Sequence, residues 1–451
     1  MKTTKVKWLN HPVLKNIEID FNNTTNNEPF QNIIFAGENG TGKTSILESL
    51  SSFLNIGSFE YFDFIEYLID EKRYKAVQSN NNTSSIKDFF DIIDENGSRT
   101  HIHSNKNNNN QSIETNPLDP RKYGCVFSKA RADYKTKEIK YATTKGLDVD
   151  KYDNDQEDDF TSLKQLVVDI QNQDNSDYAE LNQNLGNNPK PWDDYYPDSK
   201  IYRFKNAFDN FFNNMTYEKV IDQNNQKVIL FKKYNNTIAI DQLSTGEKQI
   251  VFRGIYLLKN NQMLQDSTIM IDEPELSMHP KWQKGILKYY KDLFVGNSSH
   301  TNVQIFIATH SDYVMENALK DSENDLTIVL TDNNGAIETK RIDAPSVLPS
   351  ITSAETNYLA FDIASNSYHI ELYGHLQNKH NLRTVKSTDD YIKNQSEYDS
   401  SIHSKPSSFG TTQYETLSTY IRNAIDHPNP SKSYTEDELR TSIELFIKLC
   451  Q

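Results

Sequence analysis

The sequence predicts an α/β fold with an inserted helical lobe, followed by a C-terminal α-helical bundle. A short apolar strand at residues 33–36 leads into a glycine-rich loop and then into a helix-forming stretch. Two more apolar runs, at residues 268–271 and 303–309, are typical of buried parallel strands. After residue 345 the apolar residues recur at helical spacing instead. These observations indicate a parallel-sheet domain followed by a smaller helical one.

The size and composition of the chain limit its class. At 451 residues it is long enough for two or three domains, each with its own core. Cys125 and Cys450 are too few for a disulfide framework, which suits a reducing cytosol. No apolar run approaches membrane-spanning length. The net charge of -15 argues against a surface that binds nucleic acid everywhere, but a local basic patch could still bind it. We therefore expect a soluble, cytoplasmic protein with no membrane partner.

The first strands and the glycine-rich loop come next in the chain. Residues 5–21 alternate apolar and polar side chains, which predicts a first sheet. Residues 37–44 have two glycines that bracket four residues, followed by a lysine and a hydroxyl residue, which is the pattern of a P-loop. Such a loop turns its backbone N–H groups toward phosphates at a helix N-terminus. The residues predicted to contact nucleotide are Gly37, Asn39, Gly40, Gly42, Lys43, Thr44 and Ser45.

A long stretch separates the P-loop from the next recognisable motif. It is too long for a loop, so residues 51–235 are predicted to form the inserted helical lobe. The aromatic-rich residues 59–67 are predicted to be helical, and residues 160–170 have helical apolar spacing. Polar runs at residues 79–83 and 105–110 are predicted to be exposed loops.

Acidic and histidine side chains stand where the two later strands end. The strand at 268–271 is followed by Asp272 and Glu273, and the strand at 303–309 by His310. Ligands bind at this edge of an open parallel sheet. Mg²⁺ prefers hard oxygen ligands, so Thr44 and Asp272 suit it. Glu273 can take a proton from an attacking water. His310 can position that water or contact the terminal phosphate, although a structural histidine is the alternative.

The order of the motifs resembles that of ABC-type ATPases of the SMC and RecF-like branch, sometimes grouped with the overlapping-lysogenization-defect family. Residues 37–44 are similar to the Walker A motif, 243–249 to the signature, Asp272 and Glu273 to the Walker B motif with its catalytic base, 275–279 to the D-loop, and His310 to the switch histidine. The resemblance covers residues 1–345 apart from the insertion. It implies an ABC-type ATPase domain that uses ATP and Mg²⁺.

The same resemblance implies a second subunit. Ser244 and the amide of Gly246, with Glu247 beside them in the signature, would cap the phosphate of ATP bound to the other chain. We therefore expect a homodimer that sandwiches ATP, and a higher oligomer stays open. Thr245 stands where the commonest signature has glycine. The family's adenine-stacking aromatic and Mg²⁺-sensing glutamine cannot be placed, although Trp8 is a candidate for the aromatic.

Residues 346–451 are predicted to form the helical bundle. Apolar residues at helical spacing indicate helices within 358–376, 417–425 and 439–446, with a polar loop at 378–408 between the first helices and the last pair. Thr435 and Glu438 have the spacing of a capping box for the last helix.

The helix before the last one ends in Arg422, Asn423 and His427. This spacing is similar to the arginine and histidine motif of HEPN ribonucleases, which are small helical bundles. An imidazole can take a proton from a ribose 2′-hydroxyl while a guanidinium holds the phosphate, without a metal. The alternative is a surface arginine and histidine at a helix C-terminus, where cations are favoured.

An ATPase of this type followed by such a domain resembles bacterial anticodon nucleases and phage-defence ATPases. The resemblance implies an antiphage protein in which ATP binding and hydrolysis control a C-terminal ribonuclease with RNA as the substrate, tRNA being one candidate. Two alternatives stay open. One is a sensor ATPase whose C-terminal bundle docks a separate nuclease or toxin, and the other is a DNA-repair ATPase that clamps duplex ends.

Overall fold

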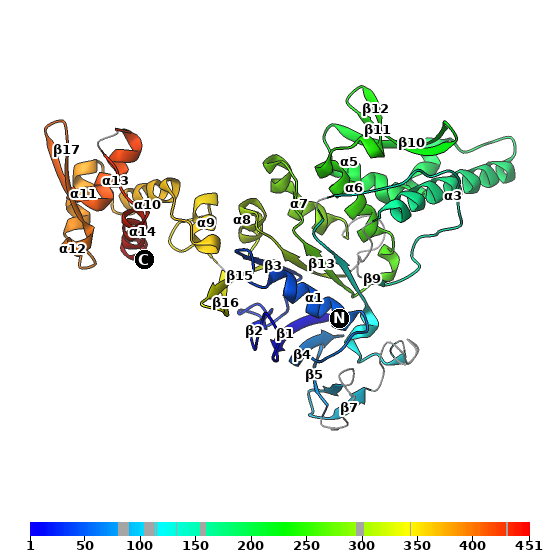
Figure 1. The fold of residues 1–451 in the computed structure, drawn as a ribbon, viewed down its shortest axis with the longest axis horizontal. Coiled ribbons are helices and arrows are strands. Elements are labelled where there is room, and N and C mark those ends of the chain that lie inside the picture. The colour runs from blue at the N-terminus through cyan, green and yellow to red at the C-terminus, as the bar shows by residue number, and fades with distance from the viewer. Residues whose placement is uncertain are drawn as a thin grey trace.

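The computed structural model describes residues 1–79, 90–102, 113, 115–131, 133–153, 159–294, 302–342, 344–429 and 432–451. The predicted loop at 105–110 and most of the one at 79–83 lie outside these residues. Figure 1 shows an α/β body with a helical lobe on one side and a C-terminal unit that extends from the other. Within the part of the chain described here, no helix is both long and apolar enough to cross a membrane.

A seven-stranded sheet forms the centre of the body. Its strand order is β16-β15-β3-β14-β13-β8-β9, and its neighbouring strands are parallel except for β15 and β16. The strands are β3 (Asn32–Gly37), β8 (Cys125–Ser128), β9 (Tyr152–Asp153), β13 (Thr268–Asp272), β14 (Gln304–Ala308), β15 (Asp325–Asn333) and β16 (Ala336–Ile342). Because β3, β14 and β13 are neighbours, the P-loop and the residues after the other two strands meet at one edge.

The central strands are buried on both faces, which explains their continuous apolar sequences. Ile34 and Ala36 of β3 lie in one core cluster, and Ile33 and Phe35 lie in another on the opposite face. The first cluster also holds side chains of α6 (Thr245–Leu258), α7 (Pro280–Asp292) and α8 (Asp312–Lys320), and the second holds those of α1 (Lys43–Leu54). Each of these four helices begins within or shortly after one of the predicted motifs.

A six-stranded antiparallel sheet packs on the α1 side of the body. Its order is β2-β1-β4-β5-β6-β7, with bounds β1 (Lys2–Trp8), β2 (Glu18–Asp20), β4 (Phe62–Ile69), β5 (Lys72–Gln78), β6 (Phe90–Ile93) and β7 (Arg99–Ile102). The helix predicted at residues 59–67 is therefore wrong. In β4 the buried aromatic side chains largely alternate with half-buried residues, and pairing with β1 and β5 fixes the segment as a strand.

The inserted helical lobe is shorter than the predicted 51–235. It consists of α3 (Thr161–Leu185), α4 (Trp192–Tyr195) and α5 (Tyr202–Phe211), and it packs with a three-stranded sheet of β10 (Met215–Gln223), β11 (Gln226–Lys233) and β12 (Asn236–Ala239). The earlier part of the insertion supplies β4 to β7 and β8 to the two main sheets. The described residues of the body also form the 3₁₀ turns η1 (Pro120–Tyr123), η2 (Tyr196–Asp198), η3 (Ile240–Gln242) and η4 (Asn261–Met263).

The C-terminal unit, residues 346–451, has its own apolar core, with Leu372, Ile421 and Phe446 fully buried. Its elements are α9 (Ser353–Phe361), α10 (Asn366–Lys379), α11 (Val385–Lys393), α12 (Ser400–His403), β17 (Ser404–Phe409), β18 (Thr412–Thr416), α13 (Leu417–Asp426) and α14 (Glu436–Cys450). The predicted capping box of the last helix is confirmed, because Thr435 and Glu438 exchange hydrogen bonds. The predicted polar loop at 378–408 is wrong, since it contains α11, α12 and most of β17.

Candidate active site

The P-loop joins β3 to α1, and two of its positions require glycine. Gly37 has φ 137° and Gly42 has φ 92°, which side chains rarely adopt. A Cβ at Gly37 would lie 2.1 Å from the carbonyl oxygen of Leu330, and one at Gly42 would lie 2.7 Å from Cδ2 of Leu14. The neighbouring β15 and the N-terminal segment therefore pack directly on the backbone of the loop.

Lys43 lies within the loop. Its Nζ donates hydrogen bonds to the carbonyl oxygens of Gly37 at 2.9 Å and Glu38 at 2.8 Å. Burial lowers the pKa of Lys43 to about 8, although Glu273 and Asp272 nearby favour the charged form. An anion in the loop would provide the counter-charge that the buried ammonium lacks. Asn39, Gly40 and Thr44 are exposed, and Ser45 is half-buried.

Thr44 and Asp272 meet as predicted for a Mg²⁺ site. The Thr44 hydroxyl donates to the Asp272 carboxylate, with distances of 3.2 and 3.1 Å to its two oxygens. Both side chains offer hard oxygen ligands, so the pair fits Mg²⁺. Burial raises the pKa of Asp272 to about 6, against the opposing effect of the Thr44 hydrogen bond. A cation at this place would return the carboxyl group to its charged form.

This pKa predicts how Mg²⁺ binding depends on pH. Asp272 is a carboxylate above about pH 6 and protonated below it, so Mg²⁺ affinity should fall about tenfold per pH unit below that value. Titration of Mg²⁺ into the ATP-saturated protein, at pH values between about 5 and 8, measures the effect. The Asp272→Asn variant should bind Mg²⁺ weakly and with a smaller pH dependence, because only the ATP phosphates still titrate in this range. A wild-type affinity that is constant across the range would contradict the prediction.

Glu273 and His310 come together at the same sheet edge. The Nε2 atom of His310 lies 3.4 Å from Oε1 of Glu273, and this contact lowers the pKa of the Glu273 carboxyl. Glu273 also has φ 43°, an unfavourable conformation for a residue with a side chain. Its N–H donates to the carbonyl oxygen of Ala308 at the end of β14. The structure therefore places an ionised carboxylate beside a histidine, near Lys43 and Asp272.

Two residues of α6 hold the Glu273 backbone from the other side. Arg253 donates to the carbonyl oxygens of Asp272 at 3.0 Å and Glu273 at 3.1 Å, and Gln249 donates to that of Pro274 at 3.2 Å. Sequence reasoning assigned neither residue a role. The two residues are four positions apart, so they lie on one face of α6. Only the tertiary structure shows that this face contacts the backbone at the end of β13. The signature helix thus fixes the strained backbone of Glu273.

Glu275 anchors the segment that carries His310. Its Oε1 accepts hydrogen bonds from the Thr309 hydroxyl at 2.7 Å, the His310 N–H at 2.8 Å and the Ser311 N–H at 3.1 Å. The side chain is buried, and burial raises its pKa. Sequence reasoning placed Glu275 in the D-loop without this function. The contact joins the residues after β13 to those after β14.

The signature residues form the N-terminus of α6. Ser244 is the N-cap, and its hydroxyl and N–H both donate to Oε2 of Glu247, at 2.8 and 2.9 Å. Glu247 is buried, and Lys233 lies 2.5 Å from its other oxygen. Glu247 thus belongs to the capping box of α6, and its predicted nucleotide contact stays a prediction. A Cβ at Gly246 would lie 2.9 Å from the carbonyl oxygen of Ser277, so the signature packs on the D-loop.

Trp8 is unsuited to stack on adenine. Its side chain is fully buried, and its Nε1 donates to the hydroxyl of Ser49 at 2.9 Å. His11 and Tyr61 form a more exposed aromatic pair, which meets edge to face with ring centroids 5.1 Å apart. Val13, two residues after His11, would lie 3.4 Å from a Cβ at Gly42. Sequence reasoning missed this pair because the two residues are far apart in the chain.

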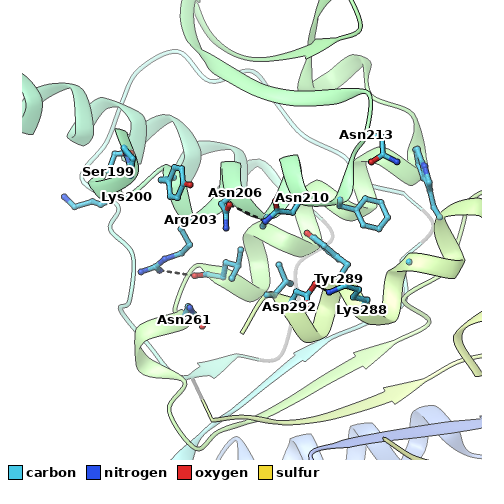
Figure 2. A pocket seen from close by; sticks show the side chains of 18 of the residues that line it. Ser199, Lys200, Arg203, Asn206, Asn210, Asn213, Asn261, Lys288, Tyr289 and Asp292 are labelled. Atoms are coloured by element: carbon cyan, nitrogen blue, oxygen red, sulfur yellow. Dashed lines mark hydrogen bonds and ion pairs between the residues drawn. The ribbon is translucent and has the colours of Figure 1, made fainter. Parts of the chain in front are cut away.

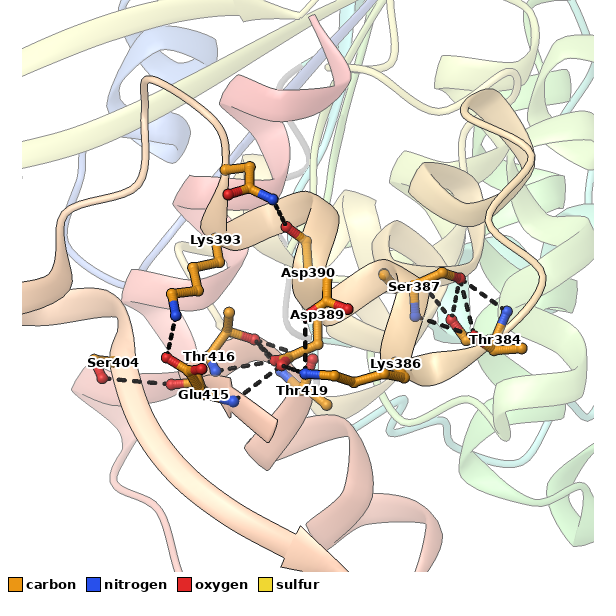
Figure 3. Close-up of polar contacts among 12 residues, drawn as sticks. Thr384, Lys386, Ser387, Asp389, Asp390, Lys393, Ser404, Glu415, Thr416 and Thr419 are labelled. Atoms are coloured by element: carbon orange, nitrogen blue, oxygen red, sulfur yellow. Dashed lines mark hydrogen bonds and ion pairs between the residues drawn. The ribbon is translucent and has the colours of Figure 1, made fainter. Parts of the chain in front are cut away.

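The predicted ribonuclease residues lie at the end of α13. Figure 3 shows how the start of this helix is fixed: buried Asp389 accepts from the Thr416 N–H at 3.0 Å and from its hydroxyl at 2.7 Å. Arg422 pairs with Asp426 at 2.7 Å and donates to the side-chain oxygen of buried Asn423. His427 is exposed beyond the helix and stacks on Phe409 of the hairpin, with centroids 4.6 Å apart. Arg422 and Asn423 are thus in contact, whereas His427 packs against β17.

Residues 80–316 match the protein family described as "AAA domain, putative AbiEii toxin, Type IV TA system". The match covers more than half of the chain and includes the signature, Asp272, Glu273 and His310. The chain belongs to this family. It is therefore an ATPase, and the predicted P-loop at residues 37–44 lies N-terminal to the matched region.

Comparisons with individual proteins are more limited. The "Retron Ec83 probable ATPase" of Escherichia coli is 32% identical over 105 residues, which is 21% of this chain and 18% of that protein. Solved structures that resemble the chain include an SMC head bound to the C-terminal winged-helix domain of ScpA, at 12% identity and a TM-score of 0.42, and the SMC head domain from Thermotoga maritima, at 14% and 0.36. Each comparison covers 76% of this chain, with 98% and 100% of the respective structures.

The geometry suits in-line attack of water on ATP. Lys43 supplies positive charge at the phosphates, and Mg²⁺ held by Thr44 and Asp272 would neutralise further charge on the transferring group. Glu273 can accept the proton of the attacking water, because its carboxylate is ionised and its backbone is fixed. His310 lies close enough to Glu273 to orient that carboxylate. These roles agree with membership of an ATPase family.

Proposed function

We propose that this ATPase is a switch of antiphage defence, in which ATP joins two copies of the chain and thereby controls the C-terminal unit. The similarity to a retron ATPase and the family's description as a toxin of a toxin–antitoxin system both support a role in defence. The proposal has two parts, which are the dimer and the effect on residues 346–451.

The signature supports the dimer. Ser244 and Gly246 stand at the N-terminus of a 14-residue helix, where backbone N–H groups and the helix dipole favour a phosphate. In the proposed dimer they would cap ATP bound to the partner. Because Gln249 and Arg253 of the same helix hold the backbone around Glu273, binding at one site would also affect the catalytic carboxylate of the other.

One observation carries the proposed control of the C-terminal unit: the contact between α8 and α9. His310 is followed directly by Ser311, the N-cap of α8, and Asp312, the first residue of that helix. Asp312 accepts a hydrogen bond at 3.3 Å from Asn357 of α9, the first helix of the C-terminal unit. Ser353 of α9 also donates to Glu316 of α8. His310 is therefore connected to the C-terminal unit through α8 and the contacts of α8 with α9.

The activity that this connection would control is a metal-independent ribonuclease at Arg422, Asn423 and His427. The exposed imidazole of His427 is available to move a proton, and its stacking on Phe409 limits its orientations. An RNA phosphate would have to displace Asp426 from Arg422, since these two side chains are paired at 2.7 Å. That ion pair would hold the site inactive until the switch is triggered.

The same ion pair also favours a second candidate. If Asp426 keeps Arg422 occupied, the unit would not cut RNA itself and would dock a separate nuclease or toxin. In that case the α8–α9 contact would control the docking surface instead of a catalytic site.

One experiment separates these functions. The purified full-length chain is incubated with total tRNA, ATP and Mg²⁺, and cleavage is followed for the wild type, Glu273→Gln and His427→Ala, with His375→Ala as a matched control in the same unit. We expect His427→Ala to cut RNA at least about a hundredfold more slowly while it hydrolyses ATP normally. Glu273→Gln should change RNA cleavage because it traps the ATP-bound state, and His375→Ala should behave like the wild type.

Equal cleavage by the wild type and His427→Ala would exclude the ribonuclease site. Absence of cleavage by every form, together with a nuclease that copurifies with the chain, would establish the docking function instead. Cleavage that is insensitive to both ATP and Glu273→Gln would exclude control by the ATPase.

A further inference from the structure

A large groove lies between α5 of the helical lobe and α7 of the α/β body, apart from the phosphate-binding loop. Its volume is about 860 Å³, which is within the usual range of sites that bind small molecules or peptides. The helices, the loop after α5 and η4 contribute its walls (Figure 2). The amide side chains that line it are Asn206, Asn210, Asn213, Asn214, Asn261 and Gln262.

Two of these amides form a short ladder on α5. Asn206 and Asn210 are four residues apart on one face of the helix, and Nδ2 of Asn210 donates to Oδ1 of Asn206 at 3.3 Å, as Figure 2 shows. This bond leaves each side chain with further donor and acceptor capacity. Four residues of a helix rise about 6 Å along its axis, which is the separation of Asn206 from Asn210. Two residues of an extended peptide span about 6.8 Å. The ladder therefore has nearly the spacing of alternate residues in an extended main chain.

Aromatic side chains form the apolar part of the groove. Phe211 packs edge to face on Tyr289, with ring centroids 4.9 Å apart, and on Trp282 at 6.2 Å. Trp282 is half-buried, so part of its indole faces the groove. The same indole would lie 3.4 Å from a Cβ at Gly246, which places this end of the groove beside the signature.

The charges of the groove distinguish between classes of occupant. Arg203 pairs with Asp148 at 2.9 Å, Lys200 with Asp177 at 3.1 Å, and Lys288 with Asp292 at 2.5 Å. Three of the four cations of the lining thus have carboxylate partners of the chain itself, and the fourth is the exposed Lys281. A nucleic-acid backbone needs lysines and arginines that can neutralise phosphates, so such an occupant is disfavoured. A neutral main chain has no such requirement.

We propose that this groove binds an extended segment of a partner polypeptide. The main-chain amides of the segment would pair with Asn206 and Asn210, and an apolar side chain of the segment would pack on Phe211 and Trp282. Main-chain pairing supplies affinity, and the aromatic walls select the side chain, as in other modes of extended-peptide recognition.

A library of random 12-residue peptides displayed on phage tests the proposal. It is panned against the full-length chain, and the affinity of an enriched peptide is measured for the wild type and the Asn206→Ala/Asn210→Ala double variant. Asn188→Ala, an exposed asparagine after α3, is the matched control. We expect the double variant to bind about tenfold more weakly or worse, and the control to bind like the wild type.

A second measurement does not depend on the folding of the variant. The same peptide, N-methylated at alternate backbone positions, should lose a similar share of its affinity for the wild type, because N-methylation removes main-chain donors. The proposal would be overturned if the methylated peptide bound with full affinity or if the double variant bound the peptide as well as the wild type. It would also be overturned if panning enriched no peptide whose binding depends on the groove. Binding of a 12-nucleotide oligouridine that the double variant loses would overturn it in favour of nucleic acid.

Discussion

Replacing Glu273 by Gln is expected to slow ATP hydrolysis by at least about a hundredfold while ATP binding is retained. The amide has nearly the shape of the carboxylate but cannot accept the proton of the attacking water. The backbone at this position is held by Ala308, Arg253 and Gln249 through hydrogen bonds to main-chain atoms, which the substitution leaves in place. Phosphate release under saturating ATP measures the rate, and fluorescent-nucleotide titration measures binding.

The same variant also reports on the proposed dimer. If hydrolysis separates the two copies, Glu273→Gln should accumulate as an ATP-bound dimer in size-exclusion chromatography coupled to light scattering, whereas the wild type should return to the monomer. Glu323→Gln, at an exposed position in the turn after α8, should hydrolyse ATP and elute like the wild type. Wild-type hydrolysis by Glu273→Gln would show that another group is the base.

Replacing Glu275 by Ala is expected to destabilise the ATPase domain by roughly 3 kcal/mol. The change removes one carboxylate oxygen that accepts from Thr309, His310 and Ser311, and it leaves these donors in a buried place without that acceptor. Because His310 then loses an anchor of its backbone, ATP hydrolysis should fall as well. Thermal unfolding and phosphate release measure the two effects.

Glu275→Gln is the matched control. The amide keeps one oxygen as an acceptor, and as a neutral group it avoids the cost of burial that raises the pKa of Glu275. We therefore expect stability within about 1 kcal/mol of the wild type and near-normal hydrolysis. If the Gln variant were as unstable as the Ala variant, or the Ala variant as stable as the wild type, the three hydrogen bonds would not have the assigned role.

Local sequence patterns predicted the site because its chemistry depends on residue type and spacing. The P-loop needs glycines at residues 37 and 42, and the structure has φ above zero at both. The strands before Asp272 and His310 were recognisable as uninterrupted apolar runs, since parallel strands are buried on both faces. Adjacent parallel strands then necessarily bring their following residues to one edge.

The errors occurred where tertiary contacts decide the local structure. Residues 59–67 were predicted as a helix, but part of that segment pairs with β1 and β5 and packs against α1 as a strand. Most of β17 was predicted as part of a polar loop, and its partner β18 was not predicted. Short polar strands have weak sequence signals, because their stability comes from pairing with a neighbour.

Sequence patterns predicted which residues meet at the sheet edge, namely the P-loop, Thr44 with Asp272, and Glu273 with His310, because each is specified by a few residues next to a strand end. Only the tertiary structure decided how these parts are fixed: Arg253 and Gln249 on the Glu273 backbone, Glu275 on the His310 segment, and α9 on α8. Such contacts join residues that are far apart in the chain. They depend on how whole helices and strands pack against one another. The sequence alone carries no local signal for them.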